Sequence, residues 1–322
     1  MFFSLSRGNF EMVEKIFNLF IETLQLTGKA STASQYYTLG SNHILNKFNS
    51  RCMDNVSEEE LISHIAAEKD NNLSRHEKRL SPKTIYDITT LINSLWAFAY
   101  EKGHVKKRIK ISTPKIIKRK VQVFIANEIR AIENHIIRNI TPHAIAILLC
   151  LYTGLRIGEV CALQWKDIDL KLKLINVHKT VIRIKNLDNN SKTKTKVIID
   201  APKSTASIRL IPIPKILIPL LKAAKEKDDY YVATGSIFFM EPRLLQKRYK
   251  TLLKLAKVQY QNFHTLRHTF ATNAYNNGMS IKILSEILGH ADVKTTLNLY
   301  VHTSMEQKQK EMNSIYKTSL AL

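Results

Sequence analysis

The segment from His264 to Tyr300 gathers side chains that can hold an anion. It begins with two imidazoles and a guanidinium, on His264, Arg267 and His268, continues to His290, and ends on the phenol of Tyr300. Only two carboxylates lie between these groups. Because guanidinium, imidazole and phenol groups all donate hydrogen bonds, the composition of the segment suits a negatively charged ligand.

The first three of these residues share one face if the segment is helical, since residues three and four apart are neighbours on a helix. A histidine pair at this spacing can also bind zinc. The helical zinc-protease pattern, however, has a glutamate directly after its first histidine, where this sequence has Thr265. A surface or satisfied core histidine and arginine would explain the spacing equally well if the segment stood alone.

Residues 278–300 allow an interpretation that needs no chemistry. The stretch "GMSIKILSEILGHADVKTTLNLY" contains two short helical patterns separated by "GHAD". This arrangement is typical of a helix-turn-helix that reads DNA. It accounts for the charge and the spacing, but it does not explain His264 with Arg267.

Two cations upstream lie where a simple solvated charge is not the obvious choice. Arg156, in "TGLRIGEV", follows a glycine turn between two apolar helical stretches, where backbone N–H groups and a guanidinium can converge on an anion. Lys203, in "APKSTASIR", lies where a β-turn should connect strands. Lysines at hairpin tips are usually solvated, so neither residue is informative alone.

Composition and charge favour a polyanionic partner. The chain has 322 residues and a formal net charge of +22, which favours nucleic acid over an acidic membrane surface. No apolar run is long enough for a membrane span, and the N-terminus lacks the pattern of a signal peptide. Cys52, Cys150 and Cys161 have no metal-ligand spacing, so free thiols and a cytoplasmic location are expected.

Hydrophobic periodicity predicts a helical first part, a basic linker and a mixed second part. The predicted early helices cover 10–29, 32–48, 57–69 and 81–102, the last with Ser81 as N-cap and Pro82 as first residue. Residues 102–120 hold nine Lys or Arg and no acid. Beyond them come an apolar helix closed by Gly154, β-branched alternation from 173 to 213 that predicts a small antiparallel sheet, and helical patterns from Pro214 onward.

Taken together and in order, these residues resemble the tyrosine recombinases, also called phage-type integrases. The family's arginine box resembles "TGLRIGEVCALQWKDID", its hairpin lysine resembles the one in "PKSTASIRLIPIP", and its HxxR and LGH boxes resemble "HTLRHTFAT" and "LGH". The resemblance implies six catalytic residues: Arg156, Lys203, His264, Arg267, His290 and Tyr300. It also implies a fold that is mainly α with a small antiparallel β-sheet, in the two-domain tyrosine recombinase architecture. The domains expected are a helical core-binding DNA-binding domain at 1–105, a basic linker at 106–120 and a catalytic domain with its C-terminal tail at 121–322.

The implied chemistry is metal- and ATP-independent DNA strand transfer through a 3′-phosphotyrosyl intermediate. Tyr300 would attack, Arg156 and Arg267 would clamp the phosphate oxygens, and the two family histidines would donate hydrogen bonds or accept the tyrosyl proton. The resemblance makes Lys203 the candidate general acid for the leaving 5′ oxygen. No metal or other cofactor is expected, since no carboxylate cluster or phosphate loop is present in the sequence.

Two residues close in sequence to the predicted catalytic arginines are expected to have supporting roles. Glu159 is expected to brace the arginine of its box rather than to perform chemistry. His268 is interpreted as structural, because the mechanism has no vacancy for it.

The basic linker and the tail suggest the partners. The candidate DNA contacts are Lys106, Lys107, Arg108, Lys118, Arg119 and Lys120. In the family, such tails pack on a neighbouring protomer, which implies a homo-tetramer on double-stranded recombination sites; a tail docked on its own chain is the alternative. A mobile-element integrase fits best. A chromosome-dimer resolvase, a catalytically silent helix-turn-helix protein and a type IB topoisomerase remain open.

Overall fold

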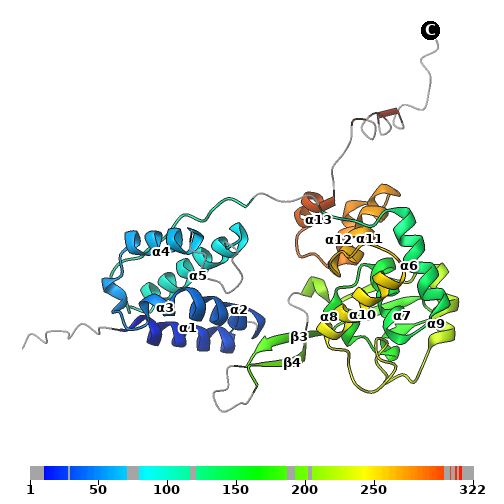
Figure 1. Ribbon diagram of the computed structural model, residues 1–322, viewed down its shortest axis with the longest axis horizontal. Coiled ribbons are helices and arrows are strands. Elements are labelled where there is room, and N and C mark those ends of the chain that lie inside the picture. Colours follow the sequence, from blue (N-terminus) through cyan, green and yellow to red (C-terminus); the bar gives the residue numbers. More distant parts are fainter. Residues whose placement is uncertain are drawn as a thin grey trace, which may run out of the picture. The chain divides into compact units, whose positions relative to one another are not determined.

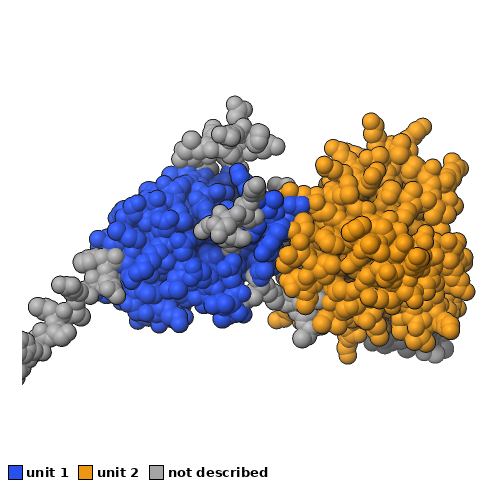
Figure 2. Space-filling model, turned by 90° about the horizontal axis from the view of Figure 1, so that it is seen from below, with its two compact units in different colours: residues 1–119, 183–196 blue, residues 120–182, 197–322 orange. Residues whose placement is uncertain are grey.

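The computed structural model describes residues 11–27, 30–70, 80–116, 121–186, 193–201 and 205–300, together with 305, 309, 312 and 313. The chain forms two compact units (Figure 2). Unit 1 comprises residues 1–119 and 183–196, and unit 2 comprises residues 120–182 and 197–322. The domain boundaries expected from the sequence stay a prediction.

Unit 1 is a helical bundle (Figure 1). Its helices are α1 (Val13–Thr27), α2 (Ala30–His43), α3 (Leu45–Phe48), α4 (Glu58–Asp70) and α5 (Pro82–Glu101), with a short 3-10 turn at Met53–Asn55. The predicted start of α5 is confirmed: the Ser81 side chain accepts a hydrogen bond from the Thr84 N–H, and Pro82 is the first helical residue. Phe17, Phe48 and Trp96 lie fully buried in the core of this unit.

Part of the stretch predicted as a linker packs into unit 1. Ile109 and Ile111 are buried in its core. Asn93 holds the backbone of Ile111 through two hydrogen bonds, one to its carbonyl at 2.8 Å and one from its N–H at 2.7 Å. The basic side chains at 106–108 nevertheless stay exposed.

Residues 183–196, at the turn end of a two-stranded hairpin, also belong to unit 1. The hairpin pairs β3 (Thr180–Lys185) with β4 (Thr195–Asp200). The Lys185 N–H donates to the Ser34 hydroxyl at 2.7 Å, and its ammonium lies 4.3 Å from the centre of the Tyr37 ring. A cation over an aromatic face is attractive, so within unit 1 this lysine fixes the end of β3 on α2.

Unit 2 is built on a buried apolar helix, α7 (Pro142–Thr153), which the sequence predicted. Around it lie α6 (Ala126–Arg138), α8 (Ile157–Ala162), α9 (Ile218–Ala224), α10 (Pro242–Leu255) and α11 (His264–Asn276). Two short helices follow, α12 (Ile281–Leu288) and α13 (Val293–Tyr300), as the helix-turn-helix pattern indicated. Among the described residues, no helix is long and apolar enough to cross a membrane.

The small antiparallel sheet of unit 2 has three strands in the order β1-β2-β5. These are β1 (Ile168–Asp169), β2 (Leu174–Val177) and β5 (Arg209–Pro212). Ile175 of β2 pairs with Ile211 of β5, and both side chains are buried. The alternating pattern that predicted strands therefore places one row of side chains in the core.

Candidate active site

Helix α11 carries two of the predicted catalytic residues, His264 and Arg267, together with His268. The rings of His264 and His268 meet edge to face, with centroids 4.5 Å apart, as their spacing of four residues predicted. Arg267 between them points inward and is 2% exposed. A buried guanidinium needs partners for its donors, and the surrounding helix ends supply them.

Arg267 joins the ends of two helices. Its Nη1 donates to the Gly154 carbonyl at 2.7 Å, and its Nη2 donates to the Leu288 carbonyl at 2.7 Å. Both carbonyls stand at helix C-termini, where backbone acceptors lack helical partners and a positive charge is favoured. Burial, followed by repulsion from Arg156, lowers the pKa of Arg267 to about 9, so the group stays charged at neutral pH.

His290 lies directly after the left-handed Gly289 that ends α12. Arg267 Nη2 lies 2.9 Å from His290 Nε2, and a guanidinium can only donate, so this nitrogen accepts. The ring proton is then on Nδ1, which donates to the Thr296 hydroxyl at 2.9 Å. Burial, and then the charge of Arg267, lowers the pKa of His290 to about 4. This imidazole is therefore neutral at pH 7.

Arg156 begins α8 and is held by its own helix. Glu159 accepts from the Arg156 backbone N–H at 2.9 Å and from its Nη1 at 2.7 Å, which confirms the expectation that Glu159 braces this arginine. The second guanidinium nitrogen, Nη2, donates to the Gly289 carbonyl at 3.0 Å. Arg156 thereby meets the turn that carries His290, and its side chain remains one-third exposed and reachable by a ligand.

Arg209 on β5 is a site residue that sequence reasoning missed. It donates to both oxygens of Glu159, at 3.0 and 2.9 Å, and its Nε donates to the Ile287 carbonyl at 2.6 Å. Burial alone would raise the pKa of Glu159, but the hydrogen bond and charge of Arg209, together with Arg156, hold it below its usual value. The available signal was a lone arginine within the apolar strand "SIRLIPIP".

Tyr300 ends α13 and packs against Ala271, Leu284 and Leu288 of its own chain. Its side chain is 5% exposed. Its hydroxyl lies 2.8 Å from His268 Nδ1. Burial raises the pKa of Tyr300, while the charges of Arg267 and Arg156 act in the opposite direction.

The described structure thus brings together five of the six predicted catalytic residues in unit 2: Arg156, His264, Arg267, His290 and Tyr300. His264 is exposed at the surface, yet partial loss of its hydration, and then the charges of His268, Arg267 and Arg156, lower its pKa. Lys203 lies outside the described residues.

Half of the predicted DNA contacts also lie outside the described residues. Lys106, Lys107 and Arg108 are exposed on unit 1, whereas Lys118, Arg119 and Lys120 lie outside the described residues. The Lys106 N–H is anchored to the Asp54 carboxylate at 2.8 Å. The backbone that presents this basic stretch is therefore fixed.

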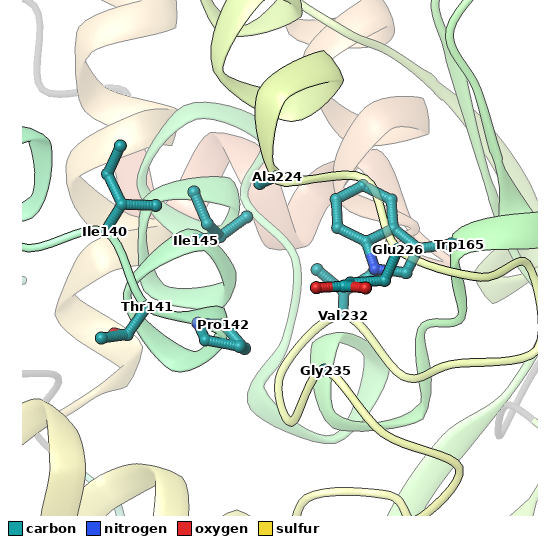
Figure 3. Close-up of a pocket in the computed structure, with 9 residues that line it drawn as sticks. All are labelled: Ile140, Thr141, Pro142, Ile145, Trp165, Ala224, Glu226, Val232 and Gly235. Atoms are coloured by element: carbon teal, nitrogen blue, oxygen red, sulfur yellow. The ribbon is translucent and has the colours of Figure 1, made fainter.

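Candidate metal ligands do not cluster in the part of the chain that the structure describes, and one pocket of unit 2 is lined by other residues than the predicted site residues. No group of three or more His, Cys, Asp or Glu side chains gathers there as metal ligands would. Figure 3 shows a pocket in unit 2 that contains none of the predicted site residues. It is lined by Ile140, Thr141, Pro142, Ile145, Trp165, Ala224, Glu226, Val232 and Gly235.

Comparison with known families decides what kind of protein carries this site. The sequence profile of the phage integrase family matches residues 122–307, more than half of the chain. The chain belongs to the phage integrase family. The resemblance to tyrosine recombinases drawn from the sequence motifs is confirmed.

Individual members of the family are similar over different lengths. The tyrosine recombinase XerC-like protein of Caldanaerobacter subterraneus is 29% identical over 269 residues, which cover 74% of this chain and 67% of that relative. The transposase from transposon Tn916 of Enterococcus faecalis is 30% identical over 189 residues, or 53% of this chain and 45% of that relative. The match therefore spans less than half of the length of this family member.

A solved structure of the family confirms the fold. The Tn1549 transposon integrase, in complex with a circular intermediate DNA, superposes with a TM-score of 0.72 at 22% identity, over 94% of this chain and 99% of that chain. The expected mainly helical, two-domain architecture with a small antiparallel sheet is correct.

Proposed function

We propose that this chain is a site-specific recombinase that cuts and rejoins duplex DNA through a 3′-phosphotyrosyl intermediate. Membership of the phage integrase family supports it, and so does the similarity to transposon proteins, which favours the integrase of a phage or other mobile element. The single observation that carries the proposal is the hydrogen-bonded hydroxyl of Tyr300 beside a cationic cluster in the same unit.

The phosphate would bind between the two arginines of the boxes. A phosphodiester carries one negative charge, and more develops on its non-bridging oxygens in the five-coordinate transition state. Guanidinium groups match these oxygens in a planar fork that lysine cannot make. Arg156 is the more exposed of the two and would contact the phosphate directly. Arg267 is buried and would contribute its positive charge to the electrostatic potential at the phosphate.

The attacking and leaving oxygens need opposite proton transfers. Tyr300 must lose its proton, and burial makes this step harder by raising its pKa, which the charges of Arg267 and Arg156 offset in part. The 5′ oxygen must gain a proton. The family resemblance assigns that role to Lys203. The phosphotyrosyl ester keeps the energy of the broken bond, so a 5′ hydroxyl can reseal it without ATP.

Covalent capture tests this proposal. The protein and its Tyr300→Phe variant are incubated with a library of nicked duplexes that lose the leaving strand after cleavage. Adducts are then separated under denaturing conditions and the attached DNA is sequenced. We expect an adduct with the wild type that is absent from the variant. Salt-sensitive DNA binding without any adduct would instead favour a catalytically silent DNA-binding protein.

Strand exchange separates the recombinase from a type IB topoisomerase. Two labelled duplexes that carry the captured sequence should yield recombinant products in the presence of the wild-type chain. Relaxation of supercoiled plasmid without any joining of two duplexes would identify a topoisomerase. Exchange between chromosomal dimer sites, rather than between an element and a target, would identify a resolvase.

A homo-tetramer on DNA belongs to the same proposal. Each chain offers one nucleophilic tyrosine, and exchange of two duplexes breaks four strands, so four protomers would supply one nucleophile for each. The C-terminal tail expected to join them lies mostly outside the described residues. Light scattering on the protein bound to a four-way junction would give four chains per junction. The cytoplasmic location also stays a prediction.

A further inference from the structure

The nucleophile's hydroxyl meets a histidine that lies outside the predicted catalytic set. His268 Nδ1 is 2.8 Å from the Tyr300 hydroxyl, and the two ring centroids are 5.7 Å apart. His268 is one turn after His264 on α11, while Tyr300 arrives from the end of α13. A contact of this length between a ring nitrogen and a phenol is a hydrogen bond within reach of proton transfer.

Among the described residues, the other two imidazoles of the site make different contacts. His290 accepts from Arg267 through Nε2 and donates to Thr296 through Nδ1, which leaves it no lone pair for a phenol. The His264 ring meets the His268 ring edge to face, with centroids 4.5 Å apart. Among the described residues, the basic nitrogen hydrogen-bonded to Tyr300 is therefore that of His268.

The surroundings favour the neutral form of His268. It is partly buried, and it faces Arg267 and His264 from its own helix and Tyr300 from α13. Burial, and then the charge of Arg267, lowers its pKa below the usual value. With the ring proton on Nε2, the lone pair of Nδ1 accepts from the phenol. This orientation is the one needed to remove a proton.

We propose that His268 is the general base that takes the proton of Tyr300 as the phenol attacks DNA, an inference that rests on the proposed function. In this step the Tyr300 oxygen forms a bond to phosphorus, and the bond between phosphorus and the 5′ oxygen breaks. The tyrosyl proton moves to His268 Nδ1, and the 5′ oxygen takes a separate proton from the general acid. The arginines compensate charge on the phosphate, and the imidazole compensates charge on the attacking oxygen.

Three variants in a single-turnover cleavage assay test the base. His268→Asn places an amide near the position of Nδ1, so it can keep a hydrogen bond to the phenol but cannot accept its proton. His268→Ala removes both functions. His143→Asn is the matched control, because His143 is also a half-buried histidine of unit 2 with a lowered pKa, but it lies on α7 outside the site. Melting temperature and the salt dependence of DNA binding report whether each variant is folded.

We expect His268→Asn and His268→Ala both to slow adduct formation by about 100-fold or more, the usual contribution of a general base. The control should cleave at the wild-type rate. A His268→Asn variant that cleaves within a few-fold of wild type would overturn the inference, because a hydrogen bond alone would then suffice. An active wild type with unaffected His268 variants would contradict the role of His268 but leave the proposed function intact. A wild type that forms no adduct would contradict both the proposed function and the role of His268.

A modified leaving group separates the base from the general acid. A substrate with sulfur in place of the bridging 5′ oxygen releases a thiolate, which is a far weaker base than an alkoxide and needs no proton. Such a substrate should restore cleavage by Lys203→Ala. It should leave His268→Asn as slow as on the normal substrate, because the phenol still has to lose its proton. Recovery of His268→Asn on the sulfur substrate would contradict the assignment.

Discussion

Glu159 and Arg209 form a two-point ion pair, with both side chains more than nine-tenths buried, and Glu159 also accepts from the partly exposed guanidinium of Arg156. One carboxylate thus neutralises two guanidinium groups, of which one is partly exposed and the other is buried. The pair fixes β5 relative to α8, and through the Ile287 and Gly289 carbonyls the two arginines also reach the end of α12. Arg156, which we propose to be catalytic, is therefore positioned with the help of Arg209, a residue from a different part of the sequence.

Breaking this pair should destabilise unit 2. Glu159→Gln leaves Arg209 buried with no opposing charge, so we expect a loss of about 3 to 5 kcal/mol in the free energy of unfolding. Denaturant titration measures it. Asp228→Asn, which removes the partner of Lys225 in an exposed pair, is the control and should cost less than about 1 kcal/mol. Equal losses in the two variants would show that the buried ion pair contributes no more to the free energy of unfolding than the exposed one.

Gly289 should resist any side chain. Its φ of +64° is left-handed, and an added Cβ would lie 3.1 Å from the Ala206 carbonyl oxygen and 3.1 Å from Arg209. Gly289→Ala should therefore cost roughly 2 kcal/mol or more and slow cleavage, since the same turn holds Arg156 and His290. Gly278→Ala is the matched control, with a φ of +87° and open space around the added carbon. An equal cost for both would attribute the effect to backbone strain alone.

The neutral state of His290 should make stability depend on pH. Its folded pKa of about 4 lies below the ordinary value of 6.5, because it is buried beside Arg267 and also faces Arg156, Arg209 and His264. The stabilisation is present above pH 6.5 and is lost as the pH falls toward 4, since the unfolded chain binds the proton more readily.

His290→Gln should flatten this pH dependence, because its amide oxygen can still accept from Arg267 but does not titrate. Since the ring is partly exposed, we expect the flattening to be about 1 kcal/mol between pH 7.5 and pH 4.5. Urea titrations at both pH values measure it, and the value at pH 7.5 isolates the packing cost of the substitution. The same loss on acidification in both proteins would contradict a neutral His290.

The exposed basic stretch of unit 1 should contribute to DNA affinity without contributing to chemistry. Replacing Lys106, Lys107 and Arg108 by Gln should reduce the slope of log K against log salt by about 0.9 for each phosphate that is no longer neutralised. The rate of cleavage at saturating DNA should stay unchanged. Filter binding at several salt concentrations measures the slope. The comparison is a triple Gln variant at Lys215, Lys222 and Lys225, which removes the same charge from unit 2. An equal change in slope in both variants would contradict the assignment of residues 106–108 as DNA contacts.

Much of this architecture was predictable from local patterns. The cap at Ser81, the apolar run of α7 and the glycines that end α7 and α12 are determined by backbone chemistry within a few residues, and the structure confirms them. The partnership of Glu159 with Arg156 also lies within one helical turn. Such contacts follow from spacing alone.

The partners of the buried groups were not predictable in this way. Arg209 is 50 residues from Glu159, and its role depends on β5 passing under α8. His268 was interpreted as structural because the mechanism implied by the resemblance has no role left for it. The contact with Tyr300, 32 residues later, exists only because the turn after α12 brings α13 back onto α11. No short-range pattern encodes that return.

The sequence by itself determined the types of the catalytic groups and the family, because a cationic site for a phosphate requires particular side chains in a recognisable order. The tertiary structure alone decided which nitrogen meets the nucleophile and which carboxylate compensates which arginine. Hydrogen bonds and direct ion pairs form at about 3 Å, and only the folded chain brings distant residues within that distance.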